Sequence, residues 1–353
     1  MKSNLIALKT QETEIDFNLK IERFLNHIFA ENGVEITQTT TLKNFEELNE
    51  NLLHLLTNCS VVCFDLNLSN ANELLNKIDE FYFVKSQSFE YGKYWINEKD
   101  NKYCFLFDLS SLLFLENFDD KILYQTFVKN KKLTIIKTCG LDESEVKKAM
   151  KAINRPLGAS FIVVSEFLDC EIVILTENFD KEFNAYIQKI YEILDKYIYS
   201  DTKQSLVEKL SEITTIRNVK LSFCDFLTDG VFEQFLKESM ADYFEKVVSF
   251  YNISKKEDIN NFLSLNSDFL KLNNNSDEFI YETAVAMLKN KDSDVCVVIA
   301  GDMKKACIAI GDNEAIHLYK YSFNHSKNFV NNVLFKTTIF KLLKKLKKNT
   351  GLF

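Results

Sequence analysis

The sequence of 353 residues is poor in glycine and proline, with eight Gly and one Pro. Ordinary globular proteins contain about 7% Gly and about 5% Pro. A loop that wraps a phosphate needs several glycines in one short stretch, because backbone N–H groups must come close to the ligand. No five-residue window of this chain contains two glycines. The composition therefore argues against nucleotide binding through a glycine-rich loop.

Histidine is also scarce, and the eight cysteines stand singly inside apolar strings. Cysteines in such strings are usually reduced, buried thiols of a cytosolic protein. Cys59 and Cys63 flank the string SVV, but no second pair and no nearby histidine completes a zinc site. The four histidines lie far apart in sequence: His27, His54, His317 and His325. The sequence thus identifies no metal ligands and no cofactor.

The charge balance and the apolar runs exclude two further classes of partner. The chain has 43 Lys and Arg against 51 Asp and Glu, a formal net charge of -8. Binding to the phosphate backbone of nucleic acid needs clustered positive charge, so no nucleic-acid partner is expected. Nowhere do about 18 uncharged apolar residues occur together, and the first residues do not resemble a signal peptide. We therefore expect a cytoplasmic protein with no membrane partner.

Apolar periodicity predicts an α/β protein, and its length suggests two or three domains. In the first region, residues 1–130, strands alternate with helices, which is typical of a parallel sheet covered on both faces. The expected strands are 4–8, 34–42, 60–66 and 102–109, and the expected helices are 17–33 and 44–58. The stretch 74–130 is otherwise less regular.

Two further domains are predicted after residue 130. Residues 131–200 read as a small α+β domain with the order β-α-β-β-α, in which two strands flank a turn at Asp169 and the last helix covers 181–199. Residues 201–353 form a third domain. Its expected helices are 231–248, 276–290 and 328–348, and its expected strands are 220–226, 294–301, 305–312 and 315–323.

The string TCGLDESEVKKAM, residues 138–150, resembles the middle domain of the competence/damage-inducible protein A (CinA) family. In that family a strand ends in a pattern similar to Gly140–Val146 of this chain. Asp142 or Ser144 can cap the following helix, and the acidic residues suit its positive N-terminus. A capped helix accounts for these residues in full, so they indicate ancestry and not chemistry. The resemblance implies a molybdopterin-binding-like (MoaB/Mog-like) three-layer first domain and a C-terminal α/β domain of the deamidase type.

In some members of the family the first domain is a metal-dependent ADP-ribose pyrophosphatase. Its loops fall here on residues without the glycines and paired acids that such a site uses. The corresponding positions are Lys9, Thr10, Gln11 and Glu12, then Asp16, Phe17 and Asn18, then 66–74 with Leu68, Glu73 and Leu74, and finally Asp108, Leu109, Ser110 and Ser111. The resemblance therefore implies that the first domain has lost this site.

The last domain is, in many members, a nicotinamide mononucleotide deamidase with the motif A-E-S-C-T-G-G. That motif falls on residues 224–230, where Thr228 and Gly230 match and Asp225 replaces the glutamate. Phe226 stands where the family has its nucleophilic serine. Tyr251 and Lys256 resemble the family's Y-x-x-x-x-K, whose lysine activates that serine. A lysine base without a nucleophile performs no acyl transfer by this route.

The family's T-G-x-A-G-P loop is reduced here to Ala300 and Gly301 before Asp302. These changes favour a divergent, catalytically silent CinA-family protein that acts as a binding or scaffold protein, expected to be a homodimer. Two alternatives stay open. One is an enzyme acting on a nucleotide-like small molecule with substituted residues such as Asp225, Thr228, Lys256 or Cys224, and the other is a non-catalytic sensor of nicotinamide or ADP-ribose-like nucleotides.

Some of these features also have simpler explanations. Tyr251 and Lys256 can be ordinary surface residues, and Cys224 has apolar neighbours that suggest an inert, buried thiol. The basic run 341–348 can be a membrane-surface or partner helix, or the solvated face of a terminal helix whose apolar residues point inward.

Overall fold

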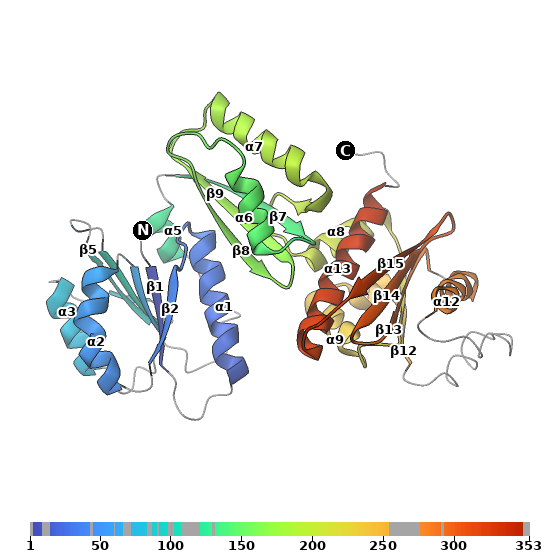
Figure 1. Cartoon of the computed structure of the whole chain (residues 1–353), viewed down its shortest axis with the longest axis horizontal. Helices are drawn as coiled ribbons and strands as arrows, with labels where there is room; N and C mark the ends of the chain where they lie inside the picture. The colour runs from blue at the N-terminus through green and yellow to red at the C-terminus, as the bar shows by residue number, and fades with distance from the viewer. Residues whose placement is uncertain are drawn as a thin grey trace. The chain divides into compact units, whose positions relative to one another are not determined.

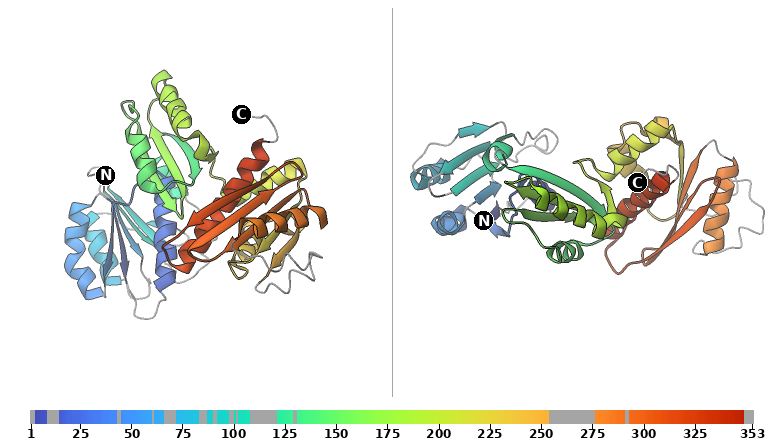
Figure 2. Two further views of the ribbon diagram at one scale, coloured as in Figure 1. Left: turned by 45° about the vertical axis from the view of Figure 1, so that its right-hand side comes forward. Right: turned by 90° about the horizontal axis from the view of Figure 1, so that it is seen from above.

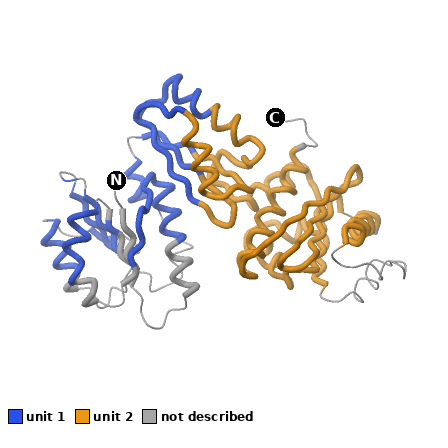
Figure 3. The backbone as a smooth tube through the Cα atoms, viewed as in Figure 1, with its two compact units in different colours: residues 1–134, 154–164, 172–187 blue, residues 135–153, 165–171, 188–353 orange. Residues whose placement is uncertain are grey.

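A computed structural model of the chain shows a mixed α/β protein (Figure 1). In the described part of the chain the strands form three sheets. The described residues are 3–8, 15–42, 45–59, 61–65, 72–82, 87–89, 92–97, 100, 102–107, 121–128, 131–253, 276–290 and 293–348. The chain divides into two compact units (Figure 3). Unit 1 comprises residues 1–134, 154–164 and 172–187, and unit 2 comprises 135–153, 165–171 and 188–353.

Unit 1 contains a six-stranded sheet of order β2-β1-β3-β6-β5-β4. Its strands are β1 (Ser3–Leu8), β2 (Gln38–Leu42), β3 (Val61–Asp65), β4 (Gln87–Phe89), β5 (Gly92–Asn97) and β6 (Lys102–Phe107). The first four strands of that order are parallel, while β5 is antiparallel to β6 and β4 is antiparallel to β5. The parallel part agrees with the alternation of strands and helices in the sequence. Strands β4 and β5 were not predicted and lie in the less regular stretch 74–130.

Helices cover both faces of this sheet, as the sequence predicts (Figure 1). They are α1 (Ile15–Glu31), α2 (Phe45–Asn58), α3 (Asn72–Tyr82) and α5 (Lys121–Phe127). Alternate residues of β6 point to opposite faces. Phe105 and Phe107 pack in an apolar cluster with α1 and α5, whereas Cys104 and Leu106 pack with α2 and α3. The sheet is therefore the middle of three layers.

The four-stranded sheet has the order β10-β7-β9-β8. Its strands are β7 (Lys132–Cys139), β8 (Ser160–Glu166), β9 (Asp169–Thr176) and β10 (Ile198–Ser200), and its helices are α6 (Glu143–Lys151) and α7 (Lys181–Leu194). Asp142 caps α6 by accepting the N–H of Glu145 at 2.8 Å, and the Glu145 carboxylate accepts the N–H of Asp142 at 2.9 Å. This capping box confirms the structural explanation of the string around Asp142. The predicted helix 181–199 is too long, because its end forms β10.

Unit 2 contains a five-stranded sheet of order β12-β11-β13-β14-β15. Its strands are β11 (Leu221–Asp225), β12 (Val247–Asn252), β13 (Val295–Gly301), β14 (Lys305–Gly311) and β15 (Ile316–Ser322). The first three strands are parallel and the last two continue as antiparallel hairpins. The helices are α8 (Leu206–Arg217), α9 (Val231–Ser239), α10 (Tyr243–Lys246), α12 (Asp277–Asn290) and α13 (Lys327–Lys348).

The two faces of this sheet are covered by different helices. Helices α8, α9 and α13 pack on one face in the largest apolar cluster, and α12 packs on the other. Figure 2 shows α12 and α13 on opposite sides of the strands. The predicted single helix 231–248 is wrong, because α9 ends at Ser239 and Val247 begins β12. The string VVSFY is rich in β-branched and aromatic residues, and its pairing with β11 decides in favour of a strand.

In the basic run at the end of α13, Phe340, Leu343 and Leu346 are buried, as the simpler explanation expects, but the lysines are not all solvated. Lys345 pairs with Asp312 at 2.8 Å, and these side chains are only 8% and 10% exposed. Lys344 and Lys347 donate to the main-chain carbonyls of Asp195 and Tyr199, at 3.2 and 3.1 Å. The run therefore binds other parts of unit 2. No helix in the described ranges is long and apolar enough to span a membrane.

Candidate functional site

The candidate site lies where β11 ends and the chain turns into α9. In the order β12-β11-β13, the chain passes from β11 through α9 to β12 on one side of β11. It later passes through α12 to β13 on the other side of β11. Open α/β sheets bind ligands beyond the carboxyl ends of the strands at such a point. Four of the residues singled out in the sequence lie at this edge: Asp225, Phe226, Thr228 and Gly230. Tyr251 lies beside them on β12, paired with Cys224. Lys256 falls outside the described residues.

The carboxylate of Asp225 is fully buried and is used by the turn itself. Its Oδ1 accepts the main-chain N–H groups of Leu227 and Thr228, both at 2.9 Å. Its Oδ2 accepts the hydroxyl of Thr228. Burial raises the pKa of the Asp225 carboxyl, and these hydrogen bonds offset only part of that effect. Asp225 therefore holds the turn closed and is not presented to a ligand.

Thr228 connects the same turn to the first turn of α9. While its hydroxyl donates to Asp225, Oγ1 accepts the N–H of Phe232 at 3.1 Å. The N–H of Val231 donates to the Thr228 carbonyl at 3.3 Å. These bonds satisfy N–H groups that a helix N-terminus otherwise offers to an anion. The N-cap residue of α9 is Gly230, and Thr228, two residues before it, is buried and accepts one N–H of the first helical turn.

Phe226 directly follows β11 and contacts both β13 and α12. Its N–H donates to the carbonyl of Ile299 at 2.8 Å, which extends the hydrogen bonding between these strands by one residue. On the other side of β11, Ile253 N–H donates to the Asp225 carbonyl at 2.9 Å. The Phe226 ring packs edge-on against Phe279 of α12, with 5.3 Å between the ring centroids. The side chain at the nucleophile position therefore points into an apolar cluster.

Gly230 and Asp229 have the left-handed backbone of a sharp turn, with φ of 87° and 56°. A Cβ on Gly230 would lie 2.7 Å from Nδ2 of Asn252, so a larger residue would be crowded as well as strained. Asp229 is exposed and pairs with Lys327 at 2.8 Å. Asn252 and Lys327 are distant from this turn in sequence and come close to it only in the folded chain. No sequence pattern around either residue predicts its contact with the turn. The agreement of Gly230 with the deamidase motif thus has a conformational explanation.

Neither neighbour of the turn provides a substitute nucleophile. Cys224 is 1% exposed, and burial raises its pKa well above the usual range, so the thiol is both inaccessible and protonated. Tyr251 packs partly buried against the cluster on the α12 face. The simpler explanation of Cys224 is therefore correct.

Gly301 is the last residue of β13 and lies where the sequence comparison places the T-G-x-A-G-P loop of the CinA family. Its φ is 117°, and a Cβ there would collide with the carbonyl oxygen of Lys305. Asp302 closes the same hairpin by accepting the N–H groups of Lys304 and Lys305 at 2.8 Å each. These hydrogen bonds hold the pKa of Asp302 below its usual value. Both residues thus serve the β13–β14 turn.

The candidate loops of the first domain lie largely outside the described residues. This applies to residues 9–12, 66–71 and 108–111. Asp16, Phe17 and Asn18 lie in α1, and Glu73 and Leu74 lie in α3, with only their backbone described. The absence of a pyrophosphatase site is therefore a prediction from the sequence.

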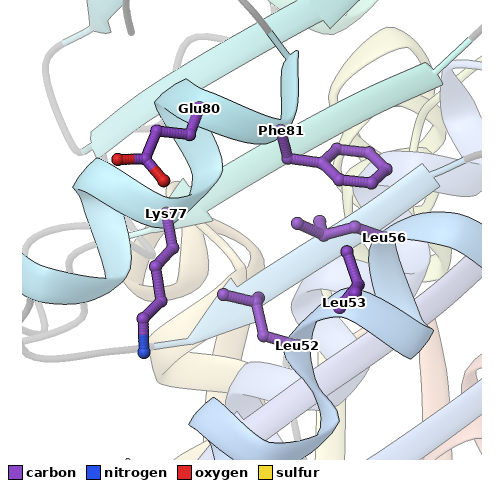
Figure 4. Close-up of a pocket in the computed structure, with 6 residues that line it drawn as sticks. All are labelled: Leu52, Leu53, Leu56, Lys77, Glu80 and Phe81. Carbon is purple, nitrogen blue, oxygen red and sulfur yellow. The ribbon is translucent and has the colours of Figure 1, made fainter.

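Two cavities lie away from the β11 turn. The larger, of about 350 Å³, lies between α2 and α3 in unit 1. Leu52, Leu53, Leu56 and Phe81 form its apolar lining, and Lys77 and Glu80 stand on the α3 side (Figure 4). The smaller, of about 190 Å³, lies in unit 2. It is lined by Ser205, Leu206, Val207, Phe235, Ser239, Asn332, Phe335 and Lys336. Neither cavity includes a residue of the deamidase-like motif.

No protein-family model and no curated protein sequence matches this chain. Solved structures of the CinA superfamily are similar to part of it. A competence or damage-inducible protein from Enterobacter asburiae is 16% identical with a TM-score of 0.37, and the match covers 40% of this chain and 96% of that chain. A CinA-superfamily protein from Escherichia coli is also 16% identical, with a TM-score of 0.38, and the match covers 42% of this chain and 93% of that chain. These low values concern the fold alone and indicate no activity.

Proposed function

We propose that this chain is a catalytically silent relative of the CinA family that acts as a binding or scaffold protein. The observation that supports the proposal most strongly is the closed turn after β11. There the Asp225 carboxylate accepts three hydrogen bonds from the turn itself. Phe226 stands at the nucleophile position, and its ring packs against an apolar cluster.

Acyl transfer needs a nucleophile next to a base and N–H donors aimed at the developing oxyanion. At this turn the N–H groups of Phe226, Leu227, Thr228 and Phe232 already have acceptors within the protein. The only thiol of the motif is buried. A substrate carboxamide would therefore meet neither an attacking atom nor an oxyanion hole among these groups.

The test is ammonia release from nicotinamide mononucleotide, measured with the full chain and with its Lys256→Ala variant. We expect no release from either protein, and no cleavage of ADP-ribose with added divalent metal. Release by the wild type that disappears in Lys256→Ala would overturn the proposal in favour of an enzyme with substituted residues. Phe226→Ser serves as a further variant, and we expect it to stay inactive because the N–H groups of the turn remain occupied.

A thermal-shift measurement separates a scaffold from a nucleotide sensor. A ligand that binds only the folded state raises the melting temperature. We expect no shift with nicotinamide mononucleotide or ADP-ribose, and a saturable shift without turnover would favour the sensor. We further propose a homodimer, for which light scattering should give twice the mass of one chain. A concentration-independent monomer would contradict that part of the proposal.

A further inference from the structure

The two edges of the five-stranded sheet differ in charge. Strand β15 forms one edge and carries His317 and Lys320, which are both exposed. Strand β12 forms the other edge, and its sequence VVSFYN contains no charged residue. Charged side chains on an edge strand are a common protection against pairing with another chain. The edge at β12 therefore lacks a protection that the edge at β15 has.

The backbone of β12 directs hydrogen-bonding groups away from β11. The pairing with β11 is regular over residues 249–252, and just after it the N–H of Ile253 donates to the carbonyl of Asp225 at 2.9 Å. In a parallel ladder, alternate residues of a strand bond to the same neighbour. Because Ile253 faces β11, the N–H and C=O groups of Phe250 and Asn252 point to the opposite side. In the described part of the chain no strand pairs with β12 on that side.

Apolar side chains lie exposed beside this edge. Phe244 of α10 is 84% exposed, and Val248 of β12 is 41% exposed. Helix α10 leads directly into β12 and contacts it. The neighbouring Tyr243 is buried instead, and its hydroxyl donates to Glu233 at 2.9 Å. The Phe244 ring therefore contributes little to the core of its own unit, and exposed apolar side chains that gather in one place mark an interaction surface.

The chemistry of this edge fits a second copy of the same strand. Unpaired N–H and C=O groups at a sheet edge are matched by another extended strand. A two-fold axis can place a strand antiparallel to its own copy, and every contact then occurs twice. Like charges directly opposite each other would oppose such pairing, but β12 has none. Its β-branched and aromatic residues are those that stabilise cross-strand pairs.

We propose that this chain dimerises by antiparallel pairing of β12 with β12 of a second copy, which joins the two five-stranded sheets into one continuous sheet. Phe244 and Val248 of both copies are covered at this interface. The proposal rests on the homodimer proposed above and specifies where its two copies meet.

The first test is amide hydrogen exchange of the full wild-type chain at protein concentrations below and above the dimer dissociation constant, which light scattering measures. The N–H groups of Phe250 and Asn252 should exchange at least about tenfold more slowly in the dimer than in the monomer. The N–H of Ile253 faces β11 and should change little. A dimer that leaves Phe250 and Asn252 unprotected overturns this interface while the homodimer stands. A monomer at every concentration overturns both.

The second test places a charge in the interface. Phe244→Glu and Val248→Glu should each raise the dimer dissociation constant at least about tenfold, because a carboxylate would be buried without a partner. Leu157→Glu and Tyr281→Glu are matched controls, since these side chains are 97% and 43% exposed and lie outside β12 and α10. They should change the dissociation constant by less than about threefold. If Phe244→Glu weakens the dimer no more than Leu157→Glu does, the interface lies elsewhere. If Val248→Glu does not fold, Phe244→Glu and the exchange measurement decide.

Discussion

Removing the Thr228 hydroxyl should destabilise the protein far more than an ordinary surface substitution. Loss of the hydrogen bond from the Phe232 N–H to the Thr228 hydroxyl costs about 1 kcal/mol. Thr228→Ala also leaves the buried Asp225 Oδ2 without its donor, which adds about 1–3 kcal/mol. We therefore expect the free energy of unfolding to fall by about 2–4 kcal/mol. Thr228→Ser keeps the hydroxyl and should lose less than about 1 kcal/mol, chiefly through its missing methyl group.

The assay is urea unfolding of both variants and the wild type, followed by circular dichroism. The difference between Thr228→Ala and Thr228→Ser isolates the hydroxyl, because both variants lack the Cγ2 methyl group of threonine. If Thr228→Ala lies within about 0.5 kcal/mol of the wild type, the closed turn is not held by this residue. The structural explanation of the motif would then fail.

The pH dependence of Asp225→Asn gives an independent check on the same turn. The folded pKa of Asp225 is raised above 3.8 by burial, so folding favours its protonated form. Its favourable contribution is present below the unfolded pKa and is lost as pH rises through the folded pKa. Relative to Asp225→Asn, the wild type should therefore lose stability as the pH rises above about 4. A difference that does not change with pH over this window would contradict a buried, ionising carboxyl.

Three further predictions concern other parts of the same unit and one matched control. Gly301→Ala should lower the free energy of unfolding by at least about 2 kcal/mol more than Gly158→Ala. Both glycines have positive φ, but only a Cβ at Gly301 would meet backbone atoms. Equal losses in urea unfolding would refute this reasoning. Phe226→Ser should lose about 1–3 kcal/mol, because the Phe226 ring is only partly buried, and should gain no deamidase activity. Any ammonia release by this variant would contradict the closed turn. The ion pair with Lys345 helps to hold the pKa of Asp312 below 3.8, against the effect of burial. Lys345→Met should therefore lower the free energy of unfolding less near pH 3 than near pH 7. An equal loss at both pH values would exclude the ion pair.

Local sequence signals predicted those elements that have clear periodicity or capping. The helix beginning at Glu143 follows from Asp142 and Glu145, whose side chains and backbone satisfy each other locally. The apolar strings that form β11, β13 and β14 were also recognised. They lie in the interior of their sheet, where an unbroken apolar run is expected.

Elements that depend on distant partners were predicted poorly. Residues 247–252 follow a short helix without a glycine or proline, so only pairing with β11 shows that they form a strand. The same applies to β10, which pairs with β7 although it continues a helical pattern. Intrinsic strand preference is weak compared with such tertiary pairing.

The sequence predicts a candidate site at residues 224–230, and the structure shows that these residues form the end of β11 and the turn that follows it. That this site lacks its nucleophile, with Phe226 at that position, stays a prediction. The engagement of Asp225 with Leu227 and Thr228 could not be predicted, because it depends on the path of the turn. The partners of Lys344, Lys345 and Lys347 lie at distant positions, so the sequence alone also left the role of the basic run undecided.

The position of α13 in the chain has a consequence for biosynthesis. Its residues Val330, Leu334, Ile339 and Leu343 belong to the apolar cluster that covers one face of the five-stranded sheet. During synthesis every strand of that sheet leaves the ribosome before this helix does. Until α13 has been synthesised, the apolar residues that it covers on that face of the sheet stay uncovered by it. Exposed apolar strands promote aggregation. A nascent chain that stalls before residue 327 should therefore be a preferred client of chaperones and proteases.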